Sequence, residues 1–443
     1  VYKTVCATCH SSGAPGVPQL GDEAAWTARL AKGREQLYQN TLYGIGDMPA
    51  AGLCGNCSEA ELRAAVRYIM RQVKPSAAAP KAAAGSAVVA PPAEPPNFVV
   101  LIADDLGWND ITPYGNDFVR TPNLERLASA GLRYDNVFLT TSSCSPSRAS
   151  ILTGRYPHSN GLMHLHQSLP PGELTVAVPL AKAGYYTAAI GKWHIGRDAQ
   201  AQFSHVQVDR DGSATGNWLD ALRDRPRGKP FFFWLASRDP HRPWNTDDDQ
   251  TGFAYDPASI SLPAGFVEGP GTREEFALYY AEVSRFDRDV GAVMAELEAQ
   301  DALHNTLVIV MSDNGRPFHG GKQLLYDDGI KTPFILHWPA QIPRAGIREQ
   351  LLSAIDIAPT LLELAGVAPL PGMQGVSFAA TLSNPDRPVR TYVFAERNWH
   401  SGDAHERLVR SLQWAYKENQ YPLHGDCIGS SYQGKPSFRE LEQ

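Results

Sequence analysis

The feature that most limits how this chain can fold is a run of alanine and proline between residues 75 and 96. Its sequence is PSAAAPKAAAGSAVVAPPAEPP. Such a run cannot build a core, and its prolines favour an extended backbone, so we expect a semi-stiff linker. The 443-residue chain therefore divides into a small module at 1–74, this linker at 75–96 and a large module from residue 97.

Five apolar runs in the large module have the length of buried strands, and each ends in polar residues. They lie at 98–105, 185–194, 230–241, 306–315 and 332–339, with helical patterns between them. This alternation is typical of a parallel α/β sheet, whose ligands bind beyond the carboxyl ends of the strands. We expect one pocket to collect the polar residues at these ends, which are Asp104, Asp105, Lys192, His194, His241, Asp313 and Asn314.

Charge and hydropathy exclude two kinds of partner. The net charge of −7 provides no basic surface for nucleic acid, and no apolar run is long enough to cross a bilayer. Because the chain begins at Val1 with neither an initiator methionine nor a signal peptide, we expect a mature or trimmed product.

The small module carries the sequence CATCH, whose first residue is Cys6. In this CxxCH pattern Cys6 and Cys9 form thioethers to haem c, and His10 supplies one axial ligand of the iron. A redox dithiol and half of a zinc site are the alternatives. We expect Met48, beside a turn-forming proline, to be the second axial ligand. Met70 is the competitor, but it lies in a helical pattern with one buried face, where we expect it to pack.

These residues resemble small cytochromes c, particularly the c5 type, over residues 1 to about 74. The resemblance implies a disulfide between Cys54 and Cys57, although a metal-binding dithiol stays open for this second CxxC pair. A disulfide indicates an oxidising compartment, so we expect an exported, periplasmic protein. The sixth cysteine, Cys427, has no assigned role.

The most specific motif of the chain is SCSPSRASILTG at residues 143–154. It resembles the CxPSRxxxLTG signature of type I sulfatases over its whole length. The resemblance implies that Cys144 is oxidised to formylglycine, whose aldehyde hydrates to a gem-diol. A free buried cysteine is the alternative.

A sulfate ester repels nucleophiles, so a sulfatase site needs a cation and fixed positive groups. Asp104, Asp105, Asp313 and Asn314 offer hard oxygen ligands suited to Ca²⁺ or Mg²⁺. The resemblance favours Ca²⁺, with residue 144 completing the coordination sphere.

The remaining catalytic roles follow from the resemblance. Arg148 holds the aldehyde hydrate, and Lys192 and Lys322 bind the sulfate oxygens. His241, alone or with Lys322, protonates the leaving group. His194 then takes the proton of the second hydroxyl, so that sulfate leaves and the aldehyde returns.

A closer resemblance is to the N-sulfoglucosamine sulfohydrolase branch, on segments such as RDPHRPW and SDNGRPF. Two departures fit an O-sulfatase equally well: Lys322 stands where this branch is expected to carry arginine, and Trp193 follows the broader GKWH pattern. His166 and Arg242 are candidates for binding a sugar, although exposed His and Arg are often only solvated.

The resemblance implies an alkaline-phosphatase-like α/β sandwich at 97–370 and a small C-terminal α+β subdomain at 371–443, after an all-α cytochrome. The usual closing strand is missing after residue 443, so we expect a reduced subdomain or a fragment. The predicted function is hydrolysis of a sulfated sugar, with a redox partner for the haem. The alternatives are a phosphonate monoester or phosphodiester hydrolase, and an electron-transfer protein with an inert sulfatase half.

Overall fold

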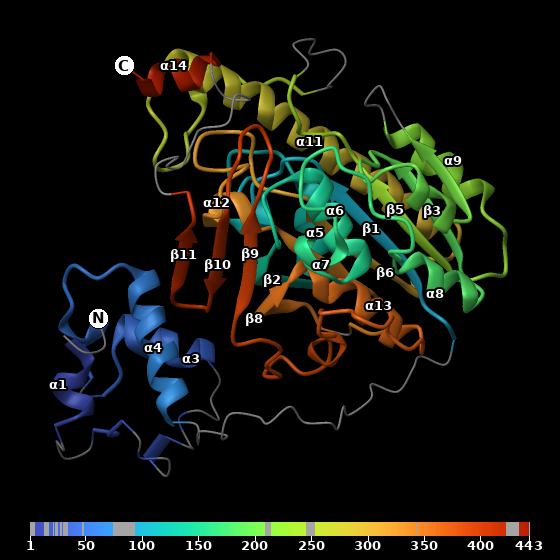
Figure 1. Ribbon diagram of the computed structural model, residues 1–443. Coiled ribbons are helices and arrows are strands. Elements are labelled where there is room, and N and C mark those ends of the chain that lie inside the picture. Colours follow the sequence, from blue (N-terminus) through green and yellow to red (C-terminus); the bar gives the residue numbers. More distant parts are fainter. Residues whose placement is uncertain are drawn as a thin grey trace. The chain divides into compact units, whose positions relative to one another are not determined.

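The computed structural model describes residues 5–12, 17–20, 22, 25, 26, 29, 34–46, 48–73, 94–208, 214–244, 253–342, 344–421 and 434–442 (Figure 1). The chain divides into two compact units, an N-terminal unit at residues 1–86 and a C-terminal unit at residues 87–443. The division falls inside the predicted linker, which up to residue 93 lies outside the described residues.

The described elements of the N-terminal unit are helices, as expected for an all-α module. They are α1 (Ala7–His10), α3 (Arg34–Tyr43), η2 (Ala50–Leu53) and α4 (Glu59–Val73). Helix α4 begins with reciprocal hydrogen bonds, from the Ser58 N–H to Glu61 Oε2 (2.8 Å) and from the Glu61 N–H to Ser58 Oγ (3.4 Å). This pattern satisfies backbone donors that the first turn would leave open.

The apolar face predicted for α4 is confirmed where the structure describes it. Leu62, Val66 and Ile69 are buried, and Ile69 packs with Trp26. The side chains of Val73 and Met70 lie outside the described residues, so the packing role given to Met70 stays a prediction.

The C-terminal unit is built on an eight-stranded sheet with the order β4-β3-β5-β1-β6-β7-β2-β8. Its strands are β1 (Asn97–Ala103), β2 (Leu132–Phe138), β3 (Tyr186–Gly191), β4 (His205–Val208), β5 (Phe231–Ala236), β6 (Thr306–Ser312), β7 (Phe334–His337) and β8 (Gly346–Ser353). The inner strand β1 pairs in parallel with both β5 and β6.

Helices cover both faces of this sheet (Figure 1). Along β1, Phe98, Val100 and Ile102 belong to one buried cluster with side chains of α6, α8 and α13, and the residues between them belong to a second cluster with α5, α9 and α11. A strand buried on both faces must be apolar throughout, which is why no polar alternation marks it. The helices are α5 (Pro122–Ala130), α6 (Cys144–Thr153), α7 (Pro157–Asn160), α8 (Ala177–Lys182), α9 (Ala214–Asp224), α11 (Pro270–Ala299), α12 (Asp327–Ile330) and α13 (Ile357–Leu364), with short η3 (Thr112–Tyr114), η4 (Asp198–Gln202), η5 (Pro257–Ser259), η6 (Ala354–Asp356) and η7 (Ala379–Thr381).

The expectation of an all-parallel sheet is wrong at β7. All five predicted strands form, but β7 pairs antiparallel with β6 and with β2. Only the four-residue α12 lies between β6 and β7, too short to cross over the sheet, so the chain re-enters from the edge where β6 ended. Strands β2, β4 and β8 were not predicted.

A second, three-stranded antiparallel sheet contains β9 (Val393–Arg397), β10 (Glu406–Arg410) and β11 (Ala415–Asn419), in the order β11-β10-β9. The last described helix, α14 (Pro436–Glu442), contributes Glu440, whose carboxylate accepts hydrogen bonds from the Gly271 and Thr272 N–H groups at the start of α11 (2.7 and 2.8 Å). These elements match the expected small α+β subdomain. Among the described helices, none has the length and apolar character that a bilayer span requires.

Candidate active site

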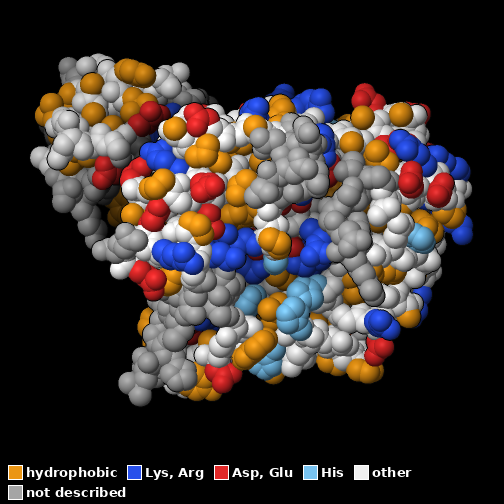
Figure 2. All heavy atoms as spheres, turned by 90° about the horizontal axis from the view of Figure 1, so that it is seen from above, with side chains coloured by type: hydrophobic (Ala, Val, Ile, Leu, Met, Phe, Trp, Pro, Cys, Tyr) orange, Lys and Arg blue, Asp and Glu red, His pale blue; other side chains and the backbone are white. Residues whose placement is uncertain are grey.

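The carboxyl ends of four parallel strands bring the predicted polar residues to one edge of the sheet. Asp104 and Asp105 follow β1, and Asp313 and Asn314 follow β6. Lys192 follows β3, and His241 lies beyond β5. On the face shown in Figure 2, histidine side chains gather next to Lys and Arg side chains. The structure therefore places these residues where the strand-end argument expected them.

Backbone contacts hold the carboxylates together. The Asp104 N–H donates to the Asp239 carbonyl (2.9 Å), and the Asp105 N–H donates to Asp313 Oδ1 (3.2 Å). Asp105 has a φ of 72°, in the left-handed region that non-glycine residues rarely adopt. Such backbone strain persists only where the surroundings enforce it, and it is common at functional sites.

Cys144 is the first residue of α6 and is buried beside these carboxylates. Its Sγ lies 3.6 Å from Asp104 Oδ1 and 4.0 Å from Asp105 Oδ1. Burial raises the pKa of the Cys144 thiol to about 12. A thiol with such a pKa is protonated at neutral pH, so the unmodified residue is not a thiolate nucleophile.

Arg148, one turn further along α6, is completely buried and joins three parts of the site. Its Nε contacts Asp313 Oδ2 at 2.7 Å, its Nη1 donates to the Lys192 carbonyl at 2.8 Å, and its Nη2 lies 3.7 Å from Asp104 Oδ1. The N-terminus of α6 adds positive potential beside Cys144.

Two lysines contact the carboxylates directly. Lys322 Nζ lies 2.6 and 2.9 Å from the two carboxylate oxygens of Asp105, and Lys192 Nζ pairs with Asp104. Burial alone would lower the pKa of Lys322, but Asp105 reverses this effect and raises it. Both ammonium groups thus contact carboxylates whose oxygens lie within 4.0 Å of Cys144 Sγ, and their role toward sulfate stays a prediction.

The oxygen donors fit a hard cation. Ligand atoms of Asp104, Asp105, Cys144 and His241 all lie within 4.8 Å of one another. Asn314 Oδ1 is buried and has no hydrogen-bond partner among the described residues, although its Nδ2 donates to Asp105 Oδ1 (2.7 Å). A buried acceptor left open next to carboxylates is what a bound Ca²⁺ or Mg²⁺ would satisfy.

Two of the predicted histidines form a pair. His194 Nε2 lies 2.7 Å from His166 Nδ1. Burial, then the charges of Lys192 and Arg148, lower the pKa of His194 to about 3. The third histidine, His241, has its Nε2 3.8 Å from Asp105 Oδ2.

In the described part of the N-terminal unit, Cys9 and His10 of the CxxCH motif lie on α1, and Cys6 is its N-cap residue. Cys6 and Cys9 are free thiols, and His10 is buried with its Nδ1 2.8 Å from the Pro18 carbonyl. That contact leaves Nε2 for an axial bond, so these residues fit haem c. Met48 is half-buried next to η2, and Cys54 and Cys57 form a disulfide with an S–S distance of 1.94 Å.

Comparison with known families agrees with this geometry. Residues 96–367 match the family model described as Sulfatase. The chain belongs to the sulfatase family. Residues 318–417 match the model of the N-sulphoglucosamine sulphohydrolase C-terminal region, and residues 1–69 match that of the cbb3-type cytochrome c oxidase subunit III. The last match supports a cytochrome module, while the c5 subtype stays a prediction.

Similar curated proteins include sulfatases of different substrates. Human N-sulphoglucosamine sulphohydrolase is 33% identical, with 61% of each chain covered. An ulvan-active sulfatase of Formosa agariphila is 27% identical, with 79% of this chain and 65% of that protein covered. Human arylsulfatase A is 31% identical, with 79% and 78% covered. The chain thus spans less than two thirds of the length of the first two relatives.

Solved structures show the same fold. The protein BT4656, in complex with its substrate D-glucosamine-2-N,6-O-disulfate, has a TM-score of 0.63 and 20% identity, with 79% of this chain and 96% of that chain covered. A Bacteroides thetaiotaomicron protein of glycosaminoglycan metabolism has a TM-score of 0.65 and 17% identity, with the same shares covered.

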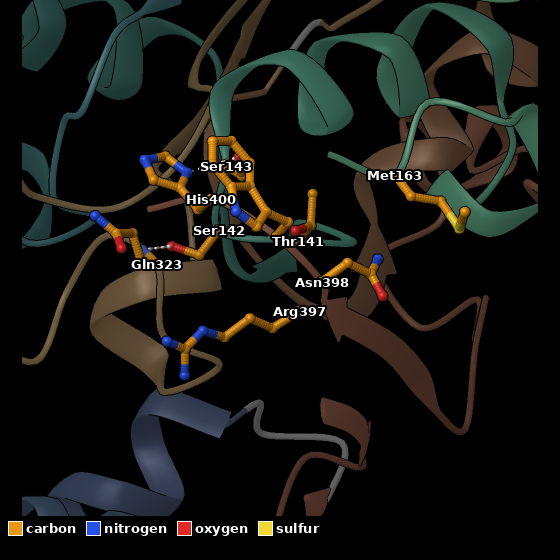
Figure 3. Close-up of a pocket in the computed structure, with 9 residues that line it drawn as sticks. Thr141, Ser142, Ser143, Met163, Gln323, Arg397, Asn398 and His400 are labelled. Atoms are coloured by element: carbon orange, nitrogen blue, oxygen red, sulfur yellow. Dashed lines mark hydrogen bonds between the residues drawn. The ribbon is translucent and has the colours of Figure 1, made fainter. Parts of the chain in front are cut away.

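A small pocket of this sulfatase contains a histidine that the sequence analysis missed. The pocket is lined by Thr141, Ser142, Ser143, Met163, Gln323, Arg397, Asn398, Trp399 and His400. His400 and Gln323 lie on one side of it, and Asn398 and Met163 on the other (Figure 3). His400 Nδ1 lies 2.8 Å from the hydroxyl of Ser143, the residue before Cys144.

His400 should make the protein sensitive to acid. Burial, then the charge of Lys322, lowers its pKa from 6.5 to about 2. Below pH 6.5 His400 is protonated in the unfolded chain but stays neutral in the folded protein. The free energy of unfolding therefore falls as the pH drops. Between pH 7 and pH 5 this contribution is about 2 kcal/mol. In urea unfolding, the free energy of unfolding of His400→Asn should fall between pH 7 and pH 5 by about this much less than that of the wild type.

The matched control is His304→Asn, because His304 is exposed. Its loss of stability between pH 7 and pH 5 should equal that of the wild type. If His400→Asn lost as much stability as the wild type between pH 7 and pH 5, His400 would not be buried and neutral in the folded protein.

The guanidinium of Arg242, predicted to bind a sugar, already has several partners within the protein. Its Nη1 pairs with Glu275, its Nε donates to the Pro317 carbonyl (3.1 Å), and its guanidinium lies 3.7 Å from the ring centre of Trp244. The ring centre of Phe318 lies 5.0 Å from the same guanidinium. The role of Arg242 toward a substrate stays a prediction.

Proposed function

We propose that the C-terminal unit hydrolyses the sulfate group of a sulfated carbohydrate, with Cys144 converted to formylglycine. The observation that carries this proposal is the burial of Cys144 between two carboxylates at the start of α6, with Lys192 and Lys322 on the same carboxylates. A protonated thiol among these charged groups is a poor nucleophile, whereas the hydrate of formylglycine there would offer a hydroxyl that can attack sulfur.

We infer that Asp104, Asp105, Asp313 and Asn314 hold Ca²⁺. The open Asn314 Oδ1 supports this set, as do the clustered carboxylates of Asp104 and Asp105. Asp313 joins them through its Oδ1, which accepts a hydrogen bond from the Asp105 N–H. When bound, the ion lowers the pKa of the hydroxyl at residue 144 and balances the charge of the sulfate.

Each charged or titratable side chain of the site then has its own role toward the substrate. Lys192 and Lys322 bind sulfate oxygens, and Arg148 orients residue 144 from within α6. His241 protonates the leaving oxygen or nitrogen, because it is the histidine next to Asp105. His194 is neutral at pH 7, as its pKa is lowered, and accepts the proton from residue 144 that lets sulfate leave.

For the substrate we propose an N- or O-sulfated glucosamine. Support comes from the match of residues 318–417 to the N-sulphoglucosamine sulphohydrolase C-terminal model, and from the relatives described above. The matched region includes Lys322 and His400, both of which lie beside Cys144 or its neighbour Ser143.

The test is release of sulfate from a panel that contains glucosamine N-sulfate, glucosamine 6-sulfate and an aryl sulfate, together with an aryl phosphonate. Turnover of sulfated glucosamine above the aryl phosphonate supports the proposal. Preference for the phosphonate, or an intact mass that retains the thiol of Cys144 in active protein, would refute it.

Calcium should stabilise the C-terminal unit. Ca²⁺ at 100 times its dissociation constant adds about 2.7 kcal/mol to the free energy of unfolding. Differential scanning fluorimetry should therefore show a higher melting temperature with Ca²⁺ than with EDTA, and a smaller shift in Asp313→Asn. If Ca²⁺ raised the melting temperature of the wild type and of Asp313→Asn equally, the ion would not be bound by Asp313.

We propose that the N-terminal unit carries haem c and that the protein works in the periplasm, where the haem links it to a redox chain. The CxxCH residues and the match of residues 1–69 support this. A covalent haem band in the full chain, lost in Cys6→Ser with Cys9→Ser, tests the attachment. If that variant keeps the sulfatase activity of the wild type under oxidising and reducing conditions alike, the redox link fails.

A further inference from the structure

The two ring nitrogens of His194 have different surroundings. Nε2 lies 2.7 Å from His166 Nδ1, and the ring centres are 4.8 Å apart. Nδ1 is buried and has no hydrogen-bond partner among the residues that the structure describes. One nitrogen is therefore engaged, and the other is open.

His166 is exposed, yet two features fix its position. Its N–H donates to the hydroxyl of Ser145 (3.2 Å), which directly follows Cys144 on α6. Its φ is 65°, and that of His194 is 66°, so both backbones are left-handed. This conformation costs energy in non-glycine residues and must be enforced by the surrounding structure. The backbone of His166 is thereby tied to the helix that begins with Cys144.

A neutral imidazole carries one N–H, and its place decides which nitrogen can act as a base. His194 is neutral at pH 7 because burial, Lys192 and Arg148 lower its pKa. A proton on Nδ1 would be a buried donor without a partner, which is rarer than an unpaired acceptor. The nearby cations also favour a lone pair on the buried nitrogen. Both arguments place the proton on Nε2, with His166 Nδ1 as its acceptor.

We propose that His166 is a positioning residue that holds His194 in the Nε2–H tautomer and so leaves Nδ1 free to accept the proton during turnover. The inference rests on the proposed sulfatase function. The sugar-binding role expected for His166 from the sequence stays a separate prediction. A positioning role through His194 predicts the same effect on every substrate, because the contact of His166 is with the base.

The tautomer can be measured without turnover. In protein with ¹⁵N-labelled histidine, the resonances of His194, assigned by their loss in His194→Gln, should show Nε2 protonated and Nδ1 unprotonated at pH 7. A proton on Nδ1 would overturn the proposal, whatever the activity of the protein.

Two replacements of His166 separate positioning from folding. Asparagine and glycine both tolerate a left-handed backbone, but only asparagine offers an acceptor near the place of Nδ1. His166→Gly should lower kcat on the order of 100-fold for all substrates, with KM changed less than about threefold. His166→Asn should recover most of that loss, and added imidazole should partly restore His166→Gly.

An equal loss of kcat in His166→Gly and His166→Asn, or a change confined to KM, would overturn the proposal. A wild type without sulfatase activity would instead refute the proposed function, and the ¹⁵N measurement would still decide the tautomer.

Discussion

Replacing Cys144 with serine will abolish sulfate release, with a fall in kcat of at least about 1,000-fold. Serine keeps the position and a hydroxyl, but it offers one hydroxyl where the hydrated aldehyde offers two, so the sulfated residue has no internal route to release its sulfate. Burial makes the plain thiol equally unfit, since it raises the pKa of Cys144 to about 12. The measurement is sulfate release by the full chain, with intact-mass analysis of the peptide that contains residue 144.

The matched control replaces Cys54 and Cys57, which form the disulfide of the N-terminal unit, with serine. That variant should keep the sulfatase activity of the wild type, which shows that loss of cysteine as such is not the cause. Activity of Cys144→Ser within tenfold of the wild type would contradict the role of residue 144.

The residues at strand ends could be predicted because the sequence itself brings them together. Each of Asp104, Lys192 and Asp313 directly follows an apolar strand, and parallel strands align their carboxyl ends at one edge. The direction of β7 could not be predicted in this way. It depends on whether the connection crosses the sheet, and the apolar run of β7 contains no sign of direction.

For two other residues, local sequence patterns could not predict the contacts that the structure shows. His400 reaches Ser143 across 257 residues of sequence, from the connection between β9 and β10. Its only signal was a histidine in a polar segment. Arg242 lies in the RDPHRPW motif, and the structure pairs its guanidinium with Glu275 and stacks it on Trp244. Such partners come from distant elements, so only the packed structure reveals them.

Replacing Arg148 with methionine should destabilise the C-terminal unit and remove its activity together. The guanidinium is fully buried and opposes the charges of Asp313 and Asp104 at 2.7 and 3.7 Å. Removing one member of such a buried set leaves an uncompensated carboxylate, at a cost of about 3–5 kcal/mol. Thermal unfolding of the full chain should show the transition of the C-terminal unit lowered by roughly 5 °C. Sulfate release should fall at least about 100-fold, because residue 144 loses its orienting cation.

Arg155→Met is the matched control, since Arg155 also forms an ion pair, at 2.7 Å to Glu173, directly after α6. Its side chain is 27% exposed, against 0% for Arg148. Water and salt screen a pair of this kind, so its loss should cost less than about 1 kcal/mol. Both variants remove one arginine, but Arg148 is buried and opposes two carboxylates, whereas Arg155 is partly exposed and opposes one, so the difference between them measures the central position of Arg148. If both lower the melting temperature equally, Arg148 is not the central cation of the site.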